Sequence, residues 1–169
     1  LLSGEVDADR TEVLQGLASN MEAIIECASA PEDFAKIEAL MREWIFIYGA
    51  VGVHPEEISA WNEDAACQVE KYLHIPKVLA VGEIGLDYHW QPQTAKKQQE
   101  ALDAQLSIAS AAGKPVILHN REATADLYSL LEAHRPLRGV VHCFADGPEI
   151  AERALDMGLY LGFGGIVTF

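Results

Sequence analysis

The sequence predicts an α/β fold built on a parallel sheet, and two observations lead to this prediction. Short, almost continuously apolar runs alternate along the chain with longer segments of helical periodicity. The apolar runs lack the alternation of apolar and polar residues that is typical of a strand with one solvent-exposed face. They therefore indicate strands that are buried on both faces. Strands of that kind, separated by helices, are typical of repeated βα units in which the strands run parallel.

Six strands and four helices are predicted from these patterns. The predicted strands are residues 23–27, 45–53, 78–82, 116–118, 139–141 and 159–163. The predicted helices are residues 31–43, 94–112, 124–134 and 148–157. In the first helix, Phe34, Ile37 and Leu40 recur at helical spacing after Pro31, a residue that suits the first turn. Gly113 predicts the end of the second helix.

Two architectures fit six parallel strands: an open doubly wound sheet and part of a closed barrel. An open sheet that binds a nucleotide needs a glycine-rich turn after its first strand, and none follows residues 23–27. Polar residues instead cluster after nearly every predicted strand, as at the active rim of a (β/α) barrel. No linker, repeat or low-complexity stretch divides the chain, so one domain over residues 1–169 is predicted.

The composition excludes several other classes of protein. Hydrophobic residues make up 50% of the chain, which excludes a disordered protein. No apolar run reaches the about 20 residues that a membrane helix needs, and the first residues lack the pattern of a signal peptide. The three widely spaced cysteines, Cys27, Cys67 and Cys143, indicate neither a disulfide framework nor a zinc knuckle. A cytoplasmic protein is therefore expected.

The charge balance limits how the protein could bind nucleic acid. The chain has 12 Lys and Arg against 26 Asp and Glu, a net charge of -14. A broad surface that tracks phosphates is disfavoured by this balance. A nucleic-acid substrate would have to be held locally, by metal ions and a few Arg or Lys side chains. Most of the acidic charge is interpreted as serving solubility.

Ionisable residues follow four successive predicted strands. They are His54, then Glu83 with Asp87, then His119 with Arg121, and then His142. Parallel packing brings the carboxyl ends of such strands to one rim. Imidazole nitrogens and carboxylate oxygens bind divalent ions, and a carboxylate can bridge two of them. The pattern predicts a metal site at this rim, with Glu83, His119 and His142 as ligands.

Each of these residues taken singly has a structural interpretation. A lone His119 or His142 is more often a hydrogen-bonded core histidine than a ligand, and Glu83 could form a buried ion pair with Arg121. Ionisable residues follow all four strands, and separate structural roles would have to arise independently at each of them. The metal site is therefore favoured over the structural interpretations.

The remaining histidines and the tryptophans are interpreted differently. His74 and His134 lie at helix ends, where surface positions are expected. His89 lies in the loop after Glu83 and could face either the site or the solvent. The tryptophans are interpreted as packing residues, although Trp90 lies in a rim loop.

Four segments, in this order and spacing, resemble the TatD family of metal-dependent deoxyribonucleases. They are GVHP at 52–55, GEIGLDY at 82–88, LHNR at 118–121 and HCF at 142–144, and the closing run 161–169 is also similar. The resemblance implies a TIM-type (β/α)8 barrel of the amidohydrolase kind that hydrolyses phosphodiester bonds in DNA. It implies two divalent ions, which could be Mg, Mn or Zn.

The resemblance also implies roles for individual residues. Glu83 would be the catalytic carboxylate that bridges the two metals, and His119 and His142 would be metal ligands. His54 and Arg121 would bind the substrate near the scissile phosphate. Asp87 would either orient a ligand or cap its loop.

The chain departs from the family pattern at both ends. The His-x-His pair of the family's first strand and the Asp of its eighth strand have no counterpart in residues 1–169. The six predicted strands are therefore expected to be strands two to seven of eight, in a barrel domain truncated at both ends. The polypeptide as it stands is expected to bind metal weakly and to turn over little substrate.

Two other functions stay open on the sequence alone. One is a different metal hydrolase of the amidohydrolase type, acting on a small ester, lactone or amide. The other is an inactive truncated domain or binding scaffold. No obligate protein partner and no membrane association are expected from the sequence.

Overall fold

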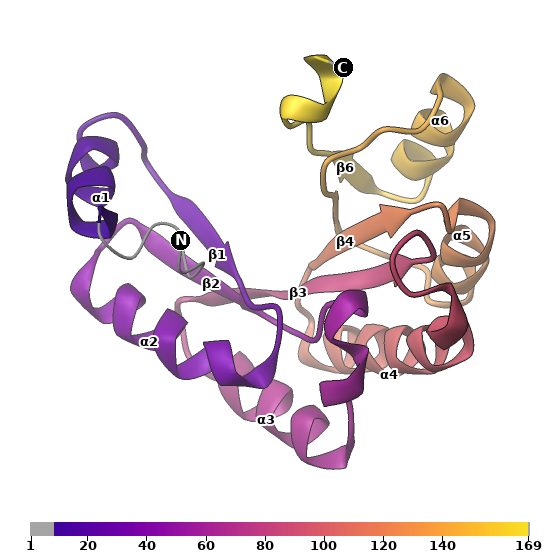
Figure 1. Ribbon diagram of the computed structural model, residues 1–169, viewed down its shortest axis with the longest axis horizontal. Helices are drawn as coiled ribbons and strands as arrows, with labels where there is room; N and C mark the ends of the chain where they lie inside the picture. Colours follow the sequence, from indigo (N-terminus) through magenta and orange to yellow (C-terminus); the bar gives the residue numbers. More distant parts are fainter. Residues whose placement is uncertain (1–8, 169) are drawn as a thin grey trace.

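Six parallel strands form one sheet in the computed structural model, which describes residues 9–168 (Figure 1). Their spatial order is their order in the chain, β1-β2-β3-β4-β5-β6. Sequential parallel order is that of a (β/α) barrel wall, so the predicted fold class is confirmed. The strands are β1 (Ile24–Cys27), β2 (Ile47–Val51), β3 (Val78–Asp87), β4 (Val116–Arg121), β5 (Gly139–Val141) and β6 (Leu159–Leu161).

Helices precede and separate the strands, and α2, α3 and α4 lie along one face of the sheet (Figure 1). The α-helices are α1 (Arg10–Ala18), α2 (Phe34–Glu43), α3 (Glu63–Leu73), α4 (Ala95–Ala112), α5 (Thr124–Ala133) and α6 (Pro148–Asp156). Short 3-10 turns are η2 (Pro31–Asp33), η3 (Pro55–Ala60), η4 (Pro92–Thr94) and η5 (Gly165–Thr168). None of the helices within residues 9–168 has the length and apolar character that crossing a lipid bilayer requires.

The four predicted helices are confirmed, but the prediction was incomplete because α1 and α3 were missed. The signal for α3 was present in the sequence. Ala65, Val69 and Leu73 recur at spacings of four and are buried against the core. Asn62 begins the helix, since its side chain accepts a hydrogen bond from the Ala65 backbone N–H at 2.9 Å.

The predicted boundary of β3 at residue 82 was wrong, because the strand continues to Asp87. Gly82 and Gly85 interrupt the apolar run and suggest a turn, but both lie inside the strand. A Cβ atom on Gly85 would lie 2.0 Å from the backbone oxygen of His119, on the neighbouring strand. These glycines therefore allow β3 and β4 to approach closely, and they place Glu83 within the strand rather than after it.

The bounds of four other strands also differ from the prediction. β1 begins one residue later, at Ile24, β4 extends to Arg121, and β2 and β6 are shorter than the runs 45–53 and 159–163. β4 continues through polar residues, which an apolar pattern does not register. Ile45 and Phe163 are apolar but lie outside β2 and β6 and are 88% and 67% exposed.

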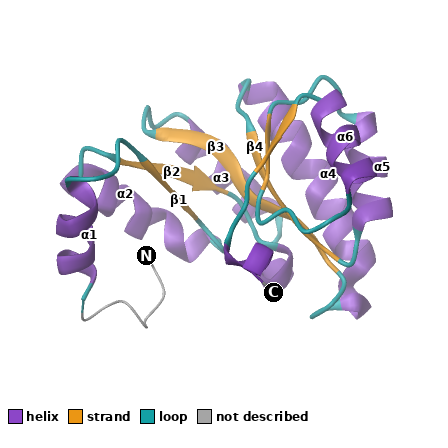
Figure 2. Cartoon of the chain, turned by 90° about the horizontal axis from the view of Figure 1, so that it is seen from above, coloured by secondary structure: helices purple, strands orange, loops and turns teal. Residues whose placement is uncertain are grey.

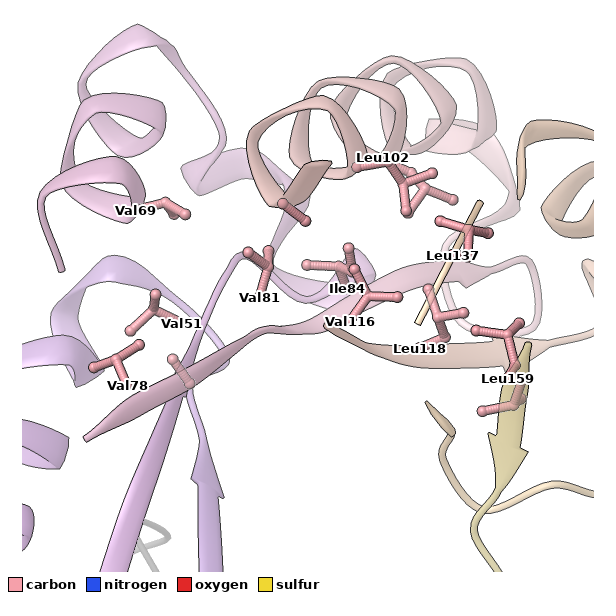
Figure 3. Packing of buried hydrophobic residues seen from close by; sticks show 14 of the residues in the cluster. Val51, Val69, Val78, Val81, Ile84, Leu102, Val116, Leu118, Leu137 and Leu159 are labelled. Atoms are coloured by element: carbon pink, nitrogen blue, oxygen red, sulfur yellow. The ribbon is translucent and has the colours of Figure 1, made fainter. Parts of the chain in front are cut away.

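The main core lies between the sheet and the helices. Figure 3 shows Val81, Ile84 and Leu118 of the central strands beside Leu102 of α4. A smaller cluster of Ala50, Ala80 and Ile117 covers part of the opposite face.

The predicted burial on both faces holds for the centre of the sheet and not for its edges. Tyr160 on β6 is 76% exposed, and Ile25 on β1 is 44% exposed. Each of these strands has one neighbouring strand in the sheet, and Figure 2 shows β1 beside β2.

Candidate metal centre at the strand ends

His54 follows β2, Glu83 lies in β3 and His119 lies in β4, and the three side chains converge. One potential ligand atom of each lies within 4.8 Å of those of the other two. The His54 and His119 ring centroids are 4.4 Å apart, and His119 Nδ1 lies 3.3 Å from Glu83 Oε1. All three side chains are partly buried, so the group is shielded from bulk water yet still reachable.

Two buried glutamines of α4 hold the backbone on either side of this group. Gln105 accepts from the Val53 N–H at 2.7 Å and donates to the Val53 carbonyl, next to His54. Gln98 makes the same pair of contacts with the backbone of Asp87, at 2.8 and 2.9 Å. The sequence analysis missed both residues. Their signal is two polar residues seven positions apart, which lie on one helix face, here the buried one.

Asp87 makes both of the contacts that were expected as alternatives. Its side chain is fully buried, and Oδ2 lies 2.9 Å from His119 Nε2. Its Oδ1 accepts a hydrogen bond from the Trp90 backbone N–H at 2.8 Å. Because an ionised carboxylate only accepts hydrogen bonds, Nε2 of His119 must carry the proton. When His119 is neutral, the lone pair is then on Nδ1, which faces Glu83.

The electrostatics of the group give His54 and Glu83 the protonation states that a metal ligand needs. Burial, with a smaller contribution from His119, lowers the pKa of His54 to about 4, so its imidazole is neutral at pH 7. Burial alone would raise the pKa of Glu83, but the His119 hydrogen bond and the nearby histidines lower it overall. Glu83 is therefore ionised.

His119 has the opposite shift from His54. Burial alone would lower its pKa, but the hydrogen bonds to Glu83 and Asp87 raise it overall. A bound cation would replace the proton on Nδ1, since metal binding and protonation compete for the same lone pair. Two imidazoles and a carboxylate are a donor set that a divalent transition-metal ion such as Zn accepts.

A second group of possible ligands shares His119 with the first. It consists of Glu56, Asp87 and His119, again with one atom of each within 4.8 Å. A neutral imidazole has one lone pair, so His119 cannot serve both groups at once. Asp87 is already engaged by the Trp90 N–H, and Glu56 is exposed. The first group is therefore the better candidate centre.

His142 and Arg121 lie at the edge of this centre. Both are exposed, and together with His119 they line a pocket of about 410 Å³. His142 lies outside the two ligand groups found among residues 9–168, although its charge acts on His54 and Glu83. Its Nε2 atom lies 3.2 Å from Cys143 Sγ. The ligand role of His142 stays a prediction, and His54 takes the third place in the described group.

The alternative ion pair between Glu83 and Arg121 is absent from the described part of the chain. Glu83 contacts His119 instead, and the Arg121 guanidinium lies over the Trp90 ring, 5.4 Å from its centroid. His74, the C-terminal cap of α3, is exposed as expected. His134 caps α5, but its side chain is only 14% exposed, and its Nε2 lies 2.8 Å from Asp103 Oδ1, so the expected surface position was wrong. His89 is exposed and lies 2.8 Å from Glu122 Oε1.

Replacing Asp87 by Asn is expected to weaken binding of Mn or Zn by roughly 10- to 100-fold, the range found for groups that orient a ligating histidine. The amide can still accept from the Trp90 N–H, but it does not fix the tautomer of His119 as a carboxylate does. Calorimetric metal titration measures the effect. Unchanged affinity in a folded variant would contradict the role of Asp87.

The chain is similar to known proteins along almost its whole length. The family model described as TatD related DNase matches residues 2–169. The chain is 36% identical, over 169 residues, to YabD of Bacillus subtilis, an uncharacterised metal-dependent hydrolase. It is 41% identical over 122 residues to the 3'-5' ssDNA/RNA exonuclease TatD of Edwardsiella piscicida. The crystal structure of the TatD homologue YjjV from Escherichia coli K12 superposes with a TM-score of 0.90 at 34% identity.

The chain corresponds to part of each of these proteins. The YabD match covers 98% of this chain and 66% of YabD, and the TatD match covers 71% of this chain and 47% of TatD. The YjjV superposition covers 99% of this chain and 66% of that structure.

Proposed function

This chain belongs to the family of TatD related DNases, and from that premise we propose that it is a metal-dependent hydrolase of nucleic acids. The observation that supports the proposal best is the convergence of His54, Glu83 and His119 at one end of the sheet. The proposed reaction is cleavage of phosphodiester bonds in DNA. The name of the TatD relative from Edwardsiella piscicida adds RNA and single strands to the candidate substrates.

The proposed site would take two divalent ions, and Glu83, His119 and His142 would hold them. When bound, such ions polarise phosphate oxygens and neutralise the charge that develops on them. Arg121 would bind a phosphate oxygen through its guanidinium N–H groups. His54 would bind the substrate near the scissile phosphate, and its imidazole, neutral at pH 7, lies beside Glu83 and His119. Asp87 would hold His119 in the orientation that frees Nδ1.

We also propose that residues 1–169 belong to one barrel domain, in which the six strands are strands two to seven of eight. The superposition on YjjV, which covers 66% of that structure, supports this assignment. The three cysteines are unpaired, which supports a reducing compartment such as the cytoplasm.

The proposed function is tested with the protein expressed from its complete coding sequence. Labelled single-stranded DNA and RNA oligonucleotides are incubated with Mg, Mn or Zn, or with EDTA. We expect hydrolysis with at least one metal and, because the site residues alone cannot supply a Lewis acid, a loss of at least about 100-fold with EDTA. Hydrolysis that is indifferent to EDTA would rule out the proposal.

A different metal hydrolase is the second candidate, and the net charge of -14 favours it. A surface so acidic repels a polyanion, whereas a small ester, lactone or amide is not repelled. The same preparations are therefore assayed on a chromogenic ester and a lactone. Activity confined to these compounds, with none on oligonucleotides, would select this alternative.

A further inference from the structure

Trp90 presents a large apolar ring to solvent beside the candidate metal centre. It follows β3 by three residues, and 59% of its surface is exposed. The Arg121 guanidinium lies 5.4 Å from the centroid of the ring, and the His89 ring meets it edge-on at 4.6 Å. Burial in the core therefore does not explain why an indole occupies this position.

The backbone of Trp90 is tied to the metal centre through one buried carboxylate. Asp87 Oδ1 accepts from the Trp90 backbone N–H at 2.8 Å, and Asp87 Oδ2 contacts His119 Nε2 at 2.9 Å. Gln98 fixes the backbone of Asp87 by two hydrogen bonds of its own. The loop that carries Trp90 is thus held in a set position relative to His119.

We propose that Trp90 and Arg121 form a binding subsite for a nucleotide next to the scissile bond, with the base stacked on the indole and a phosphate on the guanidinium. This inference rests on the proposed function. A flat indole face binds any base, and such stacking contributes roughly 5- to 150-fold in affinity per base. The guanidinium supplies paired N–H donors that match phosphate oxygens.

The subsite selects single strands over duplexes. Bases within a duplex are stacked on each other and paired, so their faces are not available to a protein ring. A base in a single strand can be turned out onto an aromatic side chain. The strongly acidic chain would then hold its substrate at a few local contacts instead of along a basic surface.

The chain offers a matched control for the pairing of an aromatic ring with a cation. Lys77 Nζ lies over the Tyr48 ring, 5.4 Å from its centroid. Tyr48 lies near the start of β2 and Lys77 directly precedes β3, so this pair is at the opposite end of the strands. Lys77 also donates to the carbonyls of Met41 and Trp44, at 2.6 and 2.8 Å. This second pair is structural.

The first test measures binding in EDTA by fluorescence anisotropy, with the protein expressed from its complete coding sequence. The probes are a labelled single-stranded oligonucleotide and the same strand with abasic sites. Trp90→Ala should weaken binding of the base-bearing strand by about tenfold and leave the abasic strand unchanged. Trp90→Phe should lose less affinity for the base-bearing strand than Trp90→Ala. Tyr48→Leu should bind both strands as tightly as the unsubstituted protein does.

The second test measures cleavage with metal present. Trp90→Ala should raise KM for the base-bearing strand while kcat stays within about twofold, since the ring contacts the substrate away from the reacting atoms. Equal losses on both strands, a fall in kcat on both, or no binding by the unsubstituted protein would overturn the inference. Metal-dependent cleavage that Trp90→Ala leaves unaffected would overturn the subsite and leave the proposed function standing. Base-dependent binding without any hydrolysis would overturn only the proposed function.

Discussion

Replacing Glu83 by Gln is expected to lower the affinity for Mn or Zn by more than about 100-fold and to abolish metal-dependent hydrolysis. Removing a group that merely orients a ligand costs roughly 10- to 100-fold, and Glu83 is the carboxylate of the described ligand group itself. Its side chain is only 17% exposed, so water cannot readily replace the lost oxygen ligand. Gln keeps the size of the side chain and removes its charge.

The measurement is calorimetric metal titration followed by the oligonucleotide assay. Glu132→Gln serves as the control, because Glu132 pairs with Arg135 and Arg153 on the helix side and lies away from the centre. A folded Glu83→Gln protein with normal metal affinity and activity would contradict the role given to Glu83.

The Glu83→Gln protein also has a readout that needs no metal. The hydrogen bond and charge of Glu83 raise the pKa of His119, so the variant should have a lower His119 pKa in EDTA. An NMR titration of the imidazole measures this change. A His119 pKa that stays unchanged would show that the two side chains do not interact in solution.

Replacing Gly85 by Ala is expected to destabilise the fold by roughly 3 kcal/mol or more, the combined scale of backbone strain and overpacking. The backbone φ angle of Gly85 is +150°, a conformation that side chains rarely adopt. The added Cβ would lie 2.0 Å from the His119 oxygen and 2.8 Å from its carbonyl carbon. These are backbone atoms in a paired strand, and Gly85 is the register partner of His119.

Neither strand can move away cheaply to admit the methyl group. Ile84 and Leu86 flank Gly85, and both are fully buried in the core. Urea unfolding followed by circular dichroism measures the loss, and any folded fraction should also bind metal weakly because His119 is displaced. Gly16→Ala is the control, since a Cβ there meets nothing within 4 Å. That change in α1 should stabilise by about 0.5–1 kcal/mol, and equal stability of the two variants would contradict the steric argument.

The alternation of apolar runs and helical segments was sufficient to predict an α/β fold with a parallel sheet, and the polar residues after the strands favoured the strand order of a barrel. Burial on both faces leaves a local pattern in the sequence, and parallel strands joined by helices follow from it. The segments around Glu83 and His119 were found in the same way, because polar residues interrupt apolar runs there. The same local signal failed where glycines lie inside β3, since a glycine in a strand and a glycine in a turn read alike in a sequence.

Which side chains meet was decided by the tertiary structure. The register of β3 against β4 pairs Gly85 with His119, and the turn of the chain after β2 brings the His54 ring to 4.4 Å from the His119 ring. Gln98 and Gln105 fix the positions from α4, through contacts that span 11 and 52 residues of sequence.

His54, expected on the substrate side, thereby lies in the same group of possible ligands as Glu83 and His119, while His142 lines the neighbouring pocket. The sequence by itself determined which residue types lie at the strand ends, because the tendency to be buried and the ability to bind a metal are properties of each single residue type. The sheet register and the curvature of the chain after each strand determined their distances, and these depend on packing between segments far apart in the sequence.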